Sequence, residues 1–253
     1  MVLRTLDRLW FSAPVAAVRQ AAAQAGDLIA PSWCVGCRAP GTQLCPSCTR
    51  DLRLMTRRPF RADEPAEALP LLDDLTVLPV LSAAAYETLV ADAVLAFKDH
   101  ERTRLSRVLA PALERAVSEA AELCRREEVL LLWPPPHPRS QLARGRHPLG
   151  ELVTQLRLPD RVVPAGHMVR HRLRARELVG SAMNQKARSQ RGRRRAEGSF
   201  MLASGAQRRL VGAQVLLVDD VLTTGATLAS LWRLLDEAGA DVPAAAVLAA
   251  TPR

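Results

Sequence analysis

The chain has 253 residues, of which 48% are hydrophobic and 24% are charged, and its formal net charge is +9. This length can bury a full hydrophobic core, and this composition excludes an intrinsically disordered chain. No uncharged apolar run reaches the roughly 18 residues that a membrane-spanning helix needs, so we expect no membrane insertion.

The N-terminal segment shares some features with a secretory signal peptide. Arg4 and Arg8 precede an apolar stretch, but Pro14 interrupts that stretch and Arg19 ends it. A signal peptide needs a continuous apolar region, so we favour a short amphipathic helix over that alternative. We accordingly expect a cytoplasmic protein.

Four of the five cysteines form the pattern C-x2-C-x7-C-x2-C, with Cys34, Cys37, Cys45 and Cys48 as its members. Two such pairs can present four thiolates tetrahedrally to one zinc ion, and a section this small needs a metal to be stable. We therefore predict structural Zn2+, with a redox pair or disulfides as the alternatives. Cys124 lies on an apolar helical stripe, which indicates a buried core thiol.

The chain divides into three sections. Residues 1–58 contain the N-terminal helix and the cysteine cluster, and residues 59–80 have four prolines and are typical of a linker. Residues 81–253 alternate between helical patterns and short apolar runs. This alternation predicts an α/β domain with a mostly parallel sheet flanked by helices.

Apolar residues at helical spacing predict helices over 86–97, 104–124 and 149–157. Pro111 should kink the second of these helices or set its start later in the sequence. The short apolar run 129–133 predicts a buried strand, because a triple proline ends it.

The most informative segment is residues 214–239, which begin with the apolar run 215–218 and end in a leucine-rich helical pattern with Gly239 at its end. This order predicts a buried strand, a loop and a helix. In an open α/β sheet such a loop lies at the carboxyl edge of the strand, where ligands bind. The loop residues are Asp219, Asp220, Thr223, Thr224, Gly225, Ala226 and Thr227.

Each residue type in this loop suits one part of a phosphorylated sugar. The amides at the start of the helix, Thr224 to Thr227, point at an anion, and Gly225 lets the backbone approach a phosphate. Asp219 and Asp220 repel phosphate, but they suit ribose hydroxyls or a Mg2+ ion. A ligand with a phosphate at one end and a diol with a metal at the other is phosphoribosyl pyrophosphate.

The run VLLVDDVLTTGAT resembles the signature of type I phosphoribosyltransferases. This resemblance implies that Asp219 and Asp220 bind the ribose and that Thr223–Thr227 hold the 5′-phosphate. Together with the N-terminal four-cysteine knuckle, the chain resembles the ComF/GntX family over most of its length, including a Tyr86–Lys98 helix and an Arg144-Gly145 loop. Lys98 and Arg144 are candidates for the pyrophosphate end of the ligand.

The chain departs from this family at one place. The family usually continues Phe-Asn-Gln after its Arg-Gly pair, whereas this chain has Arg146-His147-Pro148. If these residues contact the acceptor or the pyrophosphate, the departure alters the choice of substrate or the activity itself.

Positive charge is concentrated in residues 139–195, which contain 15 basic and 3 acidic side chains. Such a stretch can follow the phosphates of single-stranded DNA, although it can also be a solvated basic face or a pyrophosphate-binding loop. Residues 134–199 have no aromatic side chain on which bases could stack. The candidate nucleic-acid residues are Arg188, Arg191, Arg193, Arg194 and Arg195.

The sequence supports two functions. The first is Mg2+-dependent transfer of phosphoribose from phosphoribosyl pyrophosphate to an acceptor that the sequence does not identify. The second, implied by the family's link to natural competence, is a non-catalytic protein that senses this donor or a nucleotide and binds single-stranded DNA, a helicase or other DNA-uptake proteins. Turnover would separate the two.

Overall fold

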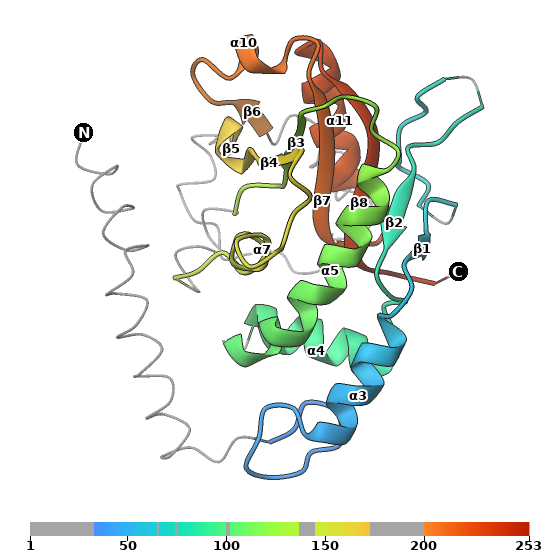
Figure 1. Ribbon diagram of the computed structural model, residues 1–253, viewed down its shortest axis with the longest axis vertical. Coiled ribbons are helices and arrows are strands. Elements are labelled where there is room, and N and C mark those ends of the chain that lie inside the picture. Colours follow the sequence, from blue (N-terminus) through green and yellow to red (C-terminus); the bar gives the residue numbers. More distant parts are fainter. Residues whose placement is uncertain are drawn as a thin grey trace, which may run out of the picture.

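The computed structural model describes residues 33–64, 66–73, 75–99, 102–136, 145–172 and 200–252 (Figure 1). Its centre is a six-stranded sheet with the strand order β1-β2-β8-β7-β3-β4, in which all neighbours are parallel except β1 and β2. The predicted α/β class with a mostly parallel sheet is confirmed. The strands are β1 Phe60–Arg61, β2 Val80–Ser82, β3 Val129–Leu132, β4 Val162–Pro164, β7 Gln214–Leu222 and β8 Asp241–Ala250.

Helices cover both faces of this sheet because its central strands are apolar on both sides. In β7, Leu216 and Val218 belong to one apolar cluster, which α4 (Thr88–Asp99) and α5 (Ser106–Ala121) complete. Val215 and Leu217 belong to a second cluster, which contains the buried leucines of α11 (Ala226–Glu237). In Figure 1, α11 and α5 accordingly lie on either side of the long strands β7 and β8.

Helix α5 starts five residues before Pro111, so the alternative in which this proline sets the helix start is wrong. The proline side chain is exposed, whereas the rest of the helix buries its apolar stripe against the sheet. Packing of that stripe offsets the loss of one backbone hydrogen bond. The helix predicted at 149–157 is shorter, since α7 spans Pro148–Val153.

The cysteine-rich section is packed on the rest of the molecule through α3 (Pro46–Met55). Leu52 of α3 is fully buried in the same apolar cluster as α4 and α5. The Arg115 guanidinium of α5 donates to the Thr56 carbonyl oxygen at 3.0 and 3.1 Å. Residues 59–80, which have the composition of a linker, contribute the edge strand β1 and a contact with the predicted phosphate loop described below.

The long loops predicted for 166–209 are wrong in part. The described residues form η2 (Gly166–Met168), the antiparallel pair β5 (Val169–His171) and β6 (Phe200–Leu202), and α10 (Gln207–Leu210). These elements are too short for periodicity to reveal them. The predicted N-terminal helix and the arginines from Arg188 to Arg195 lie outside the described residues.

The remaining short helix, η1 (Thr103–Leu105), leads into α5. None of the described helices combines the length and the apolar character that crossing a bilayer requires.

Candidate functional site

The predicted phosphate loop lies between β7 and α11, at the carboxyl edge of the sheet. β7 continues to Leu222, beyond the apolar run that predicted it, so both aspartates are part of the strand. Successive strand residues face opposite sides of a sheet. This alternation leaves Asp219 buried, with 9% of its surface exposed, and Asp220 half-buried.

The two carboxylates are in different electrostatic environments. Burial raises the pKa of Asp219 to about 8, and the charge of Asp220 adds to this shift, while a hydrogen bond from the Asp220 amide at 2.8 Å and the charge of Lys98 oppose it. Asp220 instead forms an ion pair with the Lys98 ammonium, at 2.8 Å between Oδ2 and Nζ. Lys98 comes from the last turn of α4, so a residue that was predicted near the pyrophosphate contacts the acid pair directly.

The raised pKa of Asp219 predicts a pH-dependent stability. In the unfolded chain an aspartate ionises near pH 3.9, whereas in the folded chain Asp219 holds its proton until about pH 8. The unfolded state therefore loses this proton first, and the free energy of unfolding falls as the pH rises from about 4 to 8. Asp219→Asn should remove this fall, so the variant gains roughly 2–5 kcal/mol relative to wild type between pH 4 and pH 8.

Urea unfolding of both proteins at several pH values, without divalent cations, measures this difference. The control is Asp63→Asn. Burial opposes ionisation of Asp63, but the Arg61 side chain and the Val80 amide outweigh it and lower the pKa. The stabilising effect of Asp63 is therefore complete by pH 5 and constant up to pH 8. Parallel stability curves for wild type and Asp219→Asn would contradict the assignment.

The phosphate loop turns at Gly225, which has φ +81° and directly precedes α11. A Cβ atom at this position would lie 2.7 Å from Cγ and Cδ2 of Leu69, so only glycine fits beneath that side chain. The Ala68 amide also donates to the Thr224 carbonyl oxygen at 2.9 Å. Thr223 and Thr224 are exposed and Thr227 is half-buried. Sequence reasoning missed Ala68 and Leu69, because nothing in a proline-rich segment marks it as a cover for a distant loop.

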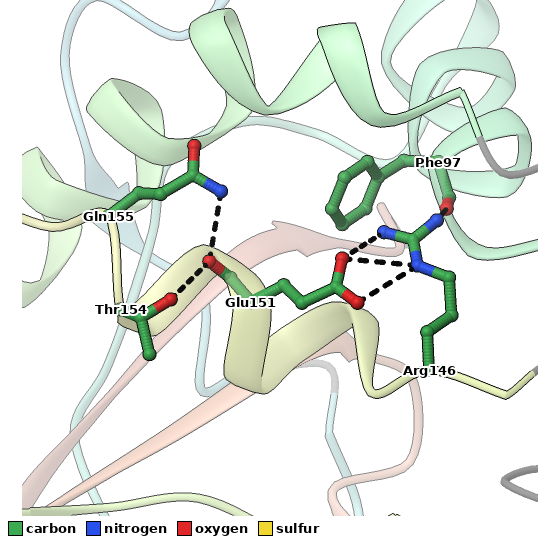
Figure 2. Close-up of polar contacts among 5 residues, drawn as sticks. All are labelled: Phe97, Arg146, Glu151, Thr154 and Gln155. Atoms are coloured by element: carbon green, nitrogen blue, oxygen red, sulfur yellow. Dashed lines mark hydrogen bonds and ion pairs between the residues drawn. The ribbon is translucent and has the colours of Figure 1, made fainter. Parts of the chain in front are cut away.

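The departure from the family pattern lies beside the acid pair. The Arg146 side chain is 2% exposed, and its guanidinium forms an ion pair with Glu151 at 2.5 Å and donates to the Phe97 carbonyl oxygen at 2.9 Å (Figure 2). Burial lowers the pKa of His147, and the negative charges of Glu151 and Asp220 partly offset this effect. Arg144 lies outside the described residues.

His147 also explains a small neighbour. A Cβ atom at Gly150 would lie 2.6 Å from Nδ1 of the His147 ring, so the ring packs on the first turn of α7. Pro148 opens that helix, where its missing N–H costs no helical hydrogen bond. The three residues that replace the family's Phe-Asn-Gln thus build the start of α7.

The four predicted metal ligands are brought together, and their sulfur atoms all lie within 4.8 Å of one another. Sulfur atoms around a tetrahedral zinc ion with Zn–S bonds of about 2.3 Å are about 3.8 Å apart, and the Cys37 and Cys45 sulfurs are separated by 3.6 Å. The Cys45 amide donates to the Cys34 sulfur at 3.4 Å, which stabilises a thiolate. This donor set fits a structural zinc ion.

The four thiols are not equivalent without a cation. Hydrogen bonds from the Ser47 hydroxyl and the Cys48 amide lower the pKa of Cys45 to about 6, whereas burial and the neighbouring thiols raise that of Cys48 to about 12. Four thiolates at this spacing repel one another, so full ionisation needs a bound cation. The cluster is a metal site rather than a set of independent reactive thiols.

Comparisons with known proteins point to one family. Two solved structures share similarity with the chain. A hypoxanthine phosphoribosyltransferase from Staphylococcus aureus matches at 12% identity over 64% of this chain and 65% of that protein, just under two thirds of its length, with a TM-score of 0.29. An adenine phosphoribosyltransferase matches at 15% identity over 80% of this chain and 89% of that protein, with a TM-score of 0.33. None of the curated proteins matches the chain.

The family comparison covers the segment that contains the acid pair, the glycine turn and α11. Residues 142–253 match the family described as Phosphoribosyl transferase domain. Residues 142–253 of this chain are therefore a phosphoribosyl transferase domain.

Proposed function

We propose that this protein binds phosphoribosyl pyrophosphate with Mg2+ and transfers its phosphoribosyl group to an acceptor. One observation carries the proposal. Within a phosphoribosyl transferase domain, a buried strand ends in two carboxylates, and the next turn, at Gly225, opens directly into the N-terminus of α11. The carboxylates suit a diol and a metal, and the helix start suits a phosphate.

Each residue has a defined part in this proposal. The amides of Thr224 to Thr227 and the threonine hydroxyls bind the 5′-phosphate, while Asp219 and Asp220 orient the ribose hydroxyls. Bound Mg2+ would neutralise charge on the pyrophosphate leaving group. The C1′–oxygen bond to pyrophosphate breaks, the leaving group keeps the bonding electron pair, and a new bond forms between C1′ and the acceptor.

Lys98 has two possible anionic partners in this reaction. Without ligand, its ammonium neutralises Asp220. When Mg2+ and the donor occupy the acid pair, the same ammonium is close enough to turn to the pyrophosphate. A cation held at this point stabilises the negative charge that develops on the leaving group.

We further propose that Zn2+ occupies the four-cysteine cluster and that the protein is a member of the ComF/GntX family. The support is the packing of a four-thiol site, through α3, onto a chain with a phosphoribosyl transferase domain. We retain the division into a metal module at 1–58, a linker at 59–80 and a main domain at 81–253 as part of this proposal. A site of reduced thiols suits the cytoplasm.

Single-stranded DNA, DNA-uptake partners and a role in competence remain predictions. The candidate residues for these partners, Arg188 to Arg195, lie outside the described residues, so they have no structural support at present.

Calorimetry with phosphoribosyl pyrophosphate tests the proposal. Asp220→Asn keeps the size of the side chain but removes its charge, so it should weaken Mg2+-dependent binding by about ten- to a hundredfold. Ribose 5-phosphate, which has no pyrophosphate to share a metal, should lose less. Asp236→Asn is the control, because Asp236 is exposed near the far end of α11.

Wild-type protein that shows no affinity at millimolar Mg2+ would exclude the donor as ligand. Binding without turnover, across a panel of nucleobase and amine acceptors, would instead favour the non-catalytic alternative.

A further inference from the structure

Arg146 is a buried cation at a position where the resembling family has another residue. Its side chain is 2% exposed, and its guanidinium lies over the Phe97 ring, 4.7 Å from the ring centroid. Figure 2 shows the guanidinium between the carboxylate of Glu151, from α7, and the main chain of Phe97, near the end of α4. A buried charge is tolerated only when it is paired, so this contact must serve a purpose that offsets its desolvation.

The two partners use different edges of the guanidinium. Nε and Nη2 donate to the Glu151 carboxylate in a fork, at 3.1 and 2.5 Å to Oε2, while Nη1 donates to the Phe97 carbonyl oxygen at 2.9 Å. The last four carbonyl groups of a helix have no intrahelical partner, and a cation at that end also interacts favourably with the helix dipole. Arg146 therefore ties the last turn of α4 to the first turn of α7.

The residue after Phe97 is Lys98, whose ammonium contacts Asp220. A lysine side chain has four rotatable bonds, and this ion pair is partly open to water, with 29% of the Lys98 side chain and 22% of the Asp220 side chain exposed. Such a pair contributes little by its own attraction, because solvent screens it and ordering costs entropy. It persists only when the backbone that carries the lysine is held in place.

We propose that Arg146 is a positioning residue for the acid pair. Held by Glu151, its guanidinium fixes the last turn of α4 and thereby keeps the Lys98 ammonium on Asp220. The consequence for ligand binding rests on the function proposed above, but the effect of Arg146 on Lys98 does not. The experiment therefore measures the two effects separately.

Three variants change this contact. Arg146→Met keeps the length and apolar volume of the side chain but removes every donor. Arg146→Lys keeps the charge but cannot form the fork to Glu151 and the bond to Phe97 together. Glu151→Gln leaves the arginine but removes the carboxylate that holds it. If Arg146→Met does not fold, the other two variants still decide the question.

Arg161→Met is a matched control. The Arg161 guanidinium also binds the end of a helix, since it donates to the Ala121 carbonyl oxygen at 2.7 Å and to that of Cys124 at 3.1 Å, at the end of α5. It also forms an ion pair with a glutamate, Glu122, at 3.5 Å. Its loss should lower stability, but α5 does not carry Lys98.

The first measurement is the rate at which an amine reagent labels Lys98, followed by mass spectrometry. Lys98 and Lys186 are the two lysines of the sequence, so labelling of Lys186 in the same sample is an internal reference. In Arg146→Met the relative labelling rate of Lys98 should rise about two- to fivefold, because its ion pair is released. Arg146→Lys and Glu151→Gln should give intermediate rates, and Arg161→Met should match wild type.

The second measurement is the affinity for phosphoribosyl pyrophosphate at millimolar Mg2+, which should fall about tenfold in Arg146→Met and stay unchanged in Arg161→Met. Unchanged Lys98 labelling in folded Arg146→Met, or an equal rise in Arg161→Met, would overturn the positioning role whatever the ligand result. Wild-type protein that fails to bind the donor would overturn the proposed function, while the labelling result would still decide the role of Arg146.

Discussion

Gly225→Ala is expected to abolish binding of both phosphoribosyl pyrophosphate and ribose 5-phosphate, with affinities at least about a hundredfold lower. The backbone at this position has φ +81°, which costs a residue with a Cβ atom about 1–2 kcal/mol. The new Cβ would also lie 2.7 Å from Leu69 Cγ and 3.3 Å from the Leu69 backbone nitrogen, so the loop or its cover must move. Both ligands carry the 5′-phosphate, and a displaced loop loses both.

Gly239→Ala separates backbone strain from the effect on the loop. Gly239 follows the other end of α11 and has nearly the same backbone conformation, φ +79°, but the nearest atom to its new Cβ would be 3.8 Å away. This variant should lose about 1–2 kcal/mol of stability and keep full ligand affinity. Calorimetry and urea unfolding of both variants give the comparison. Full affinity in Gly225→Ala would show that the phosphate does not bind at this turn.

Cys34→Ser is expected to remove the bound zinc and to unfold the cysteine-rich section. Zinc-finger peptides gain about 10–16 kcal/mol from binding the metal, and this section has little apolar area of its own to replace that contribution. The effect should spread into the main domain. A Cβ at Gly36 would meet Leu89 of α4 at 2.6 Å and the Cys48 sulfur at 2.9 Å, so the knuckle packs closely on that helix. Elemental analysis and thermal unfolding measure both effects.

Cys124→Ala is the control for this experiment. Cys124 is 4% exposed, and burial raises its pKa to about 11, which is typical of an inert core thiol. Its replacement should leave one zinc per chain. Intact wild-type protein, purified without oxygen and found to contain no zinc, would contradict the metal assignment. Loss of zinc in Cys124→Ala would show that the control thiol takes part in the cluster.

The sequence by itself determined the strand, turn and helix around Gly225, because the information there is local. A four-residue apolar run, two aspartates and a glycine before a leucine pattern define β7, the turn and α11 within 26 residues, although β7 proved longer than its apolar run. The four cysteines were equally local, since the spacing of the two pairs brings the sulfurs together.

Only the tertiary structure decided which distant side chains meet this loop. Lys98 reaches Asp220 because α4 and β7 pack on one core, and Leu69 covers Gly225 although 156 positions separate them in the sequence. Arg146 looked like a change in a possible substrate contact, yet burial made it a link between α4 and α7. Composition and periodicity describe a segment's own burial, whereas the partner of a polar side chain depends on how separate segments pack together.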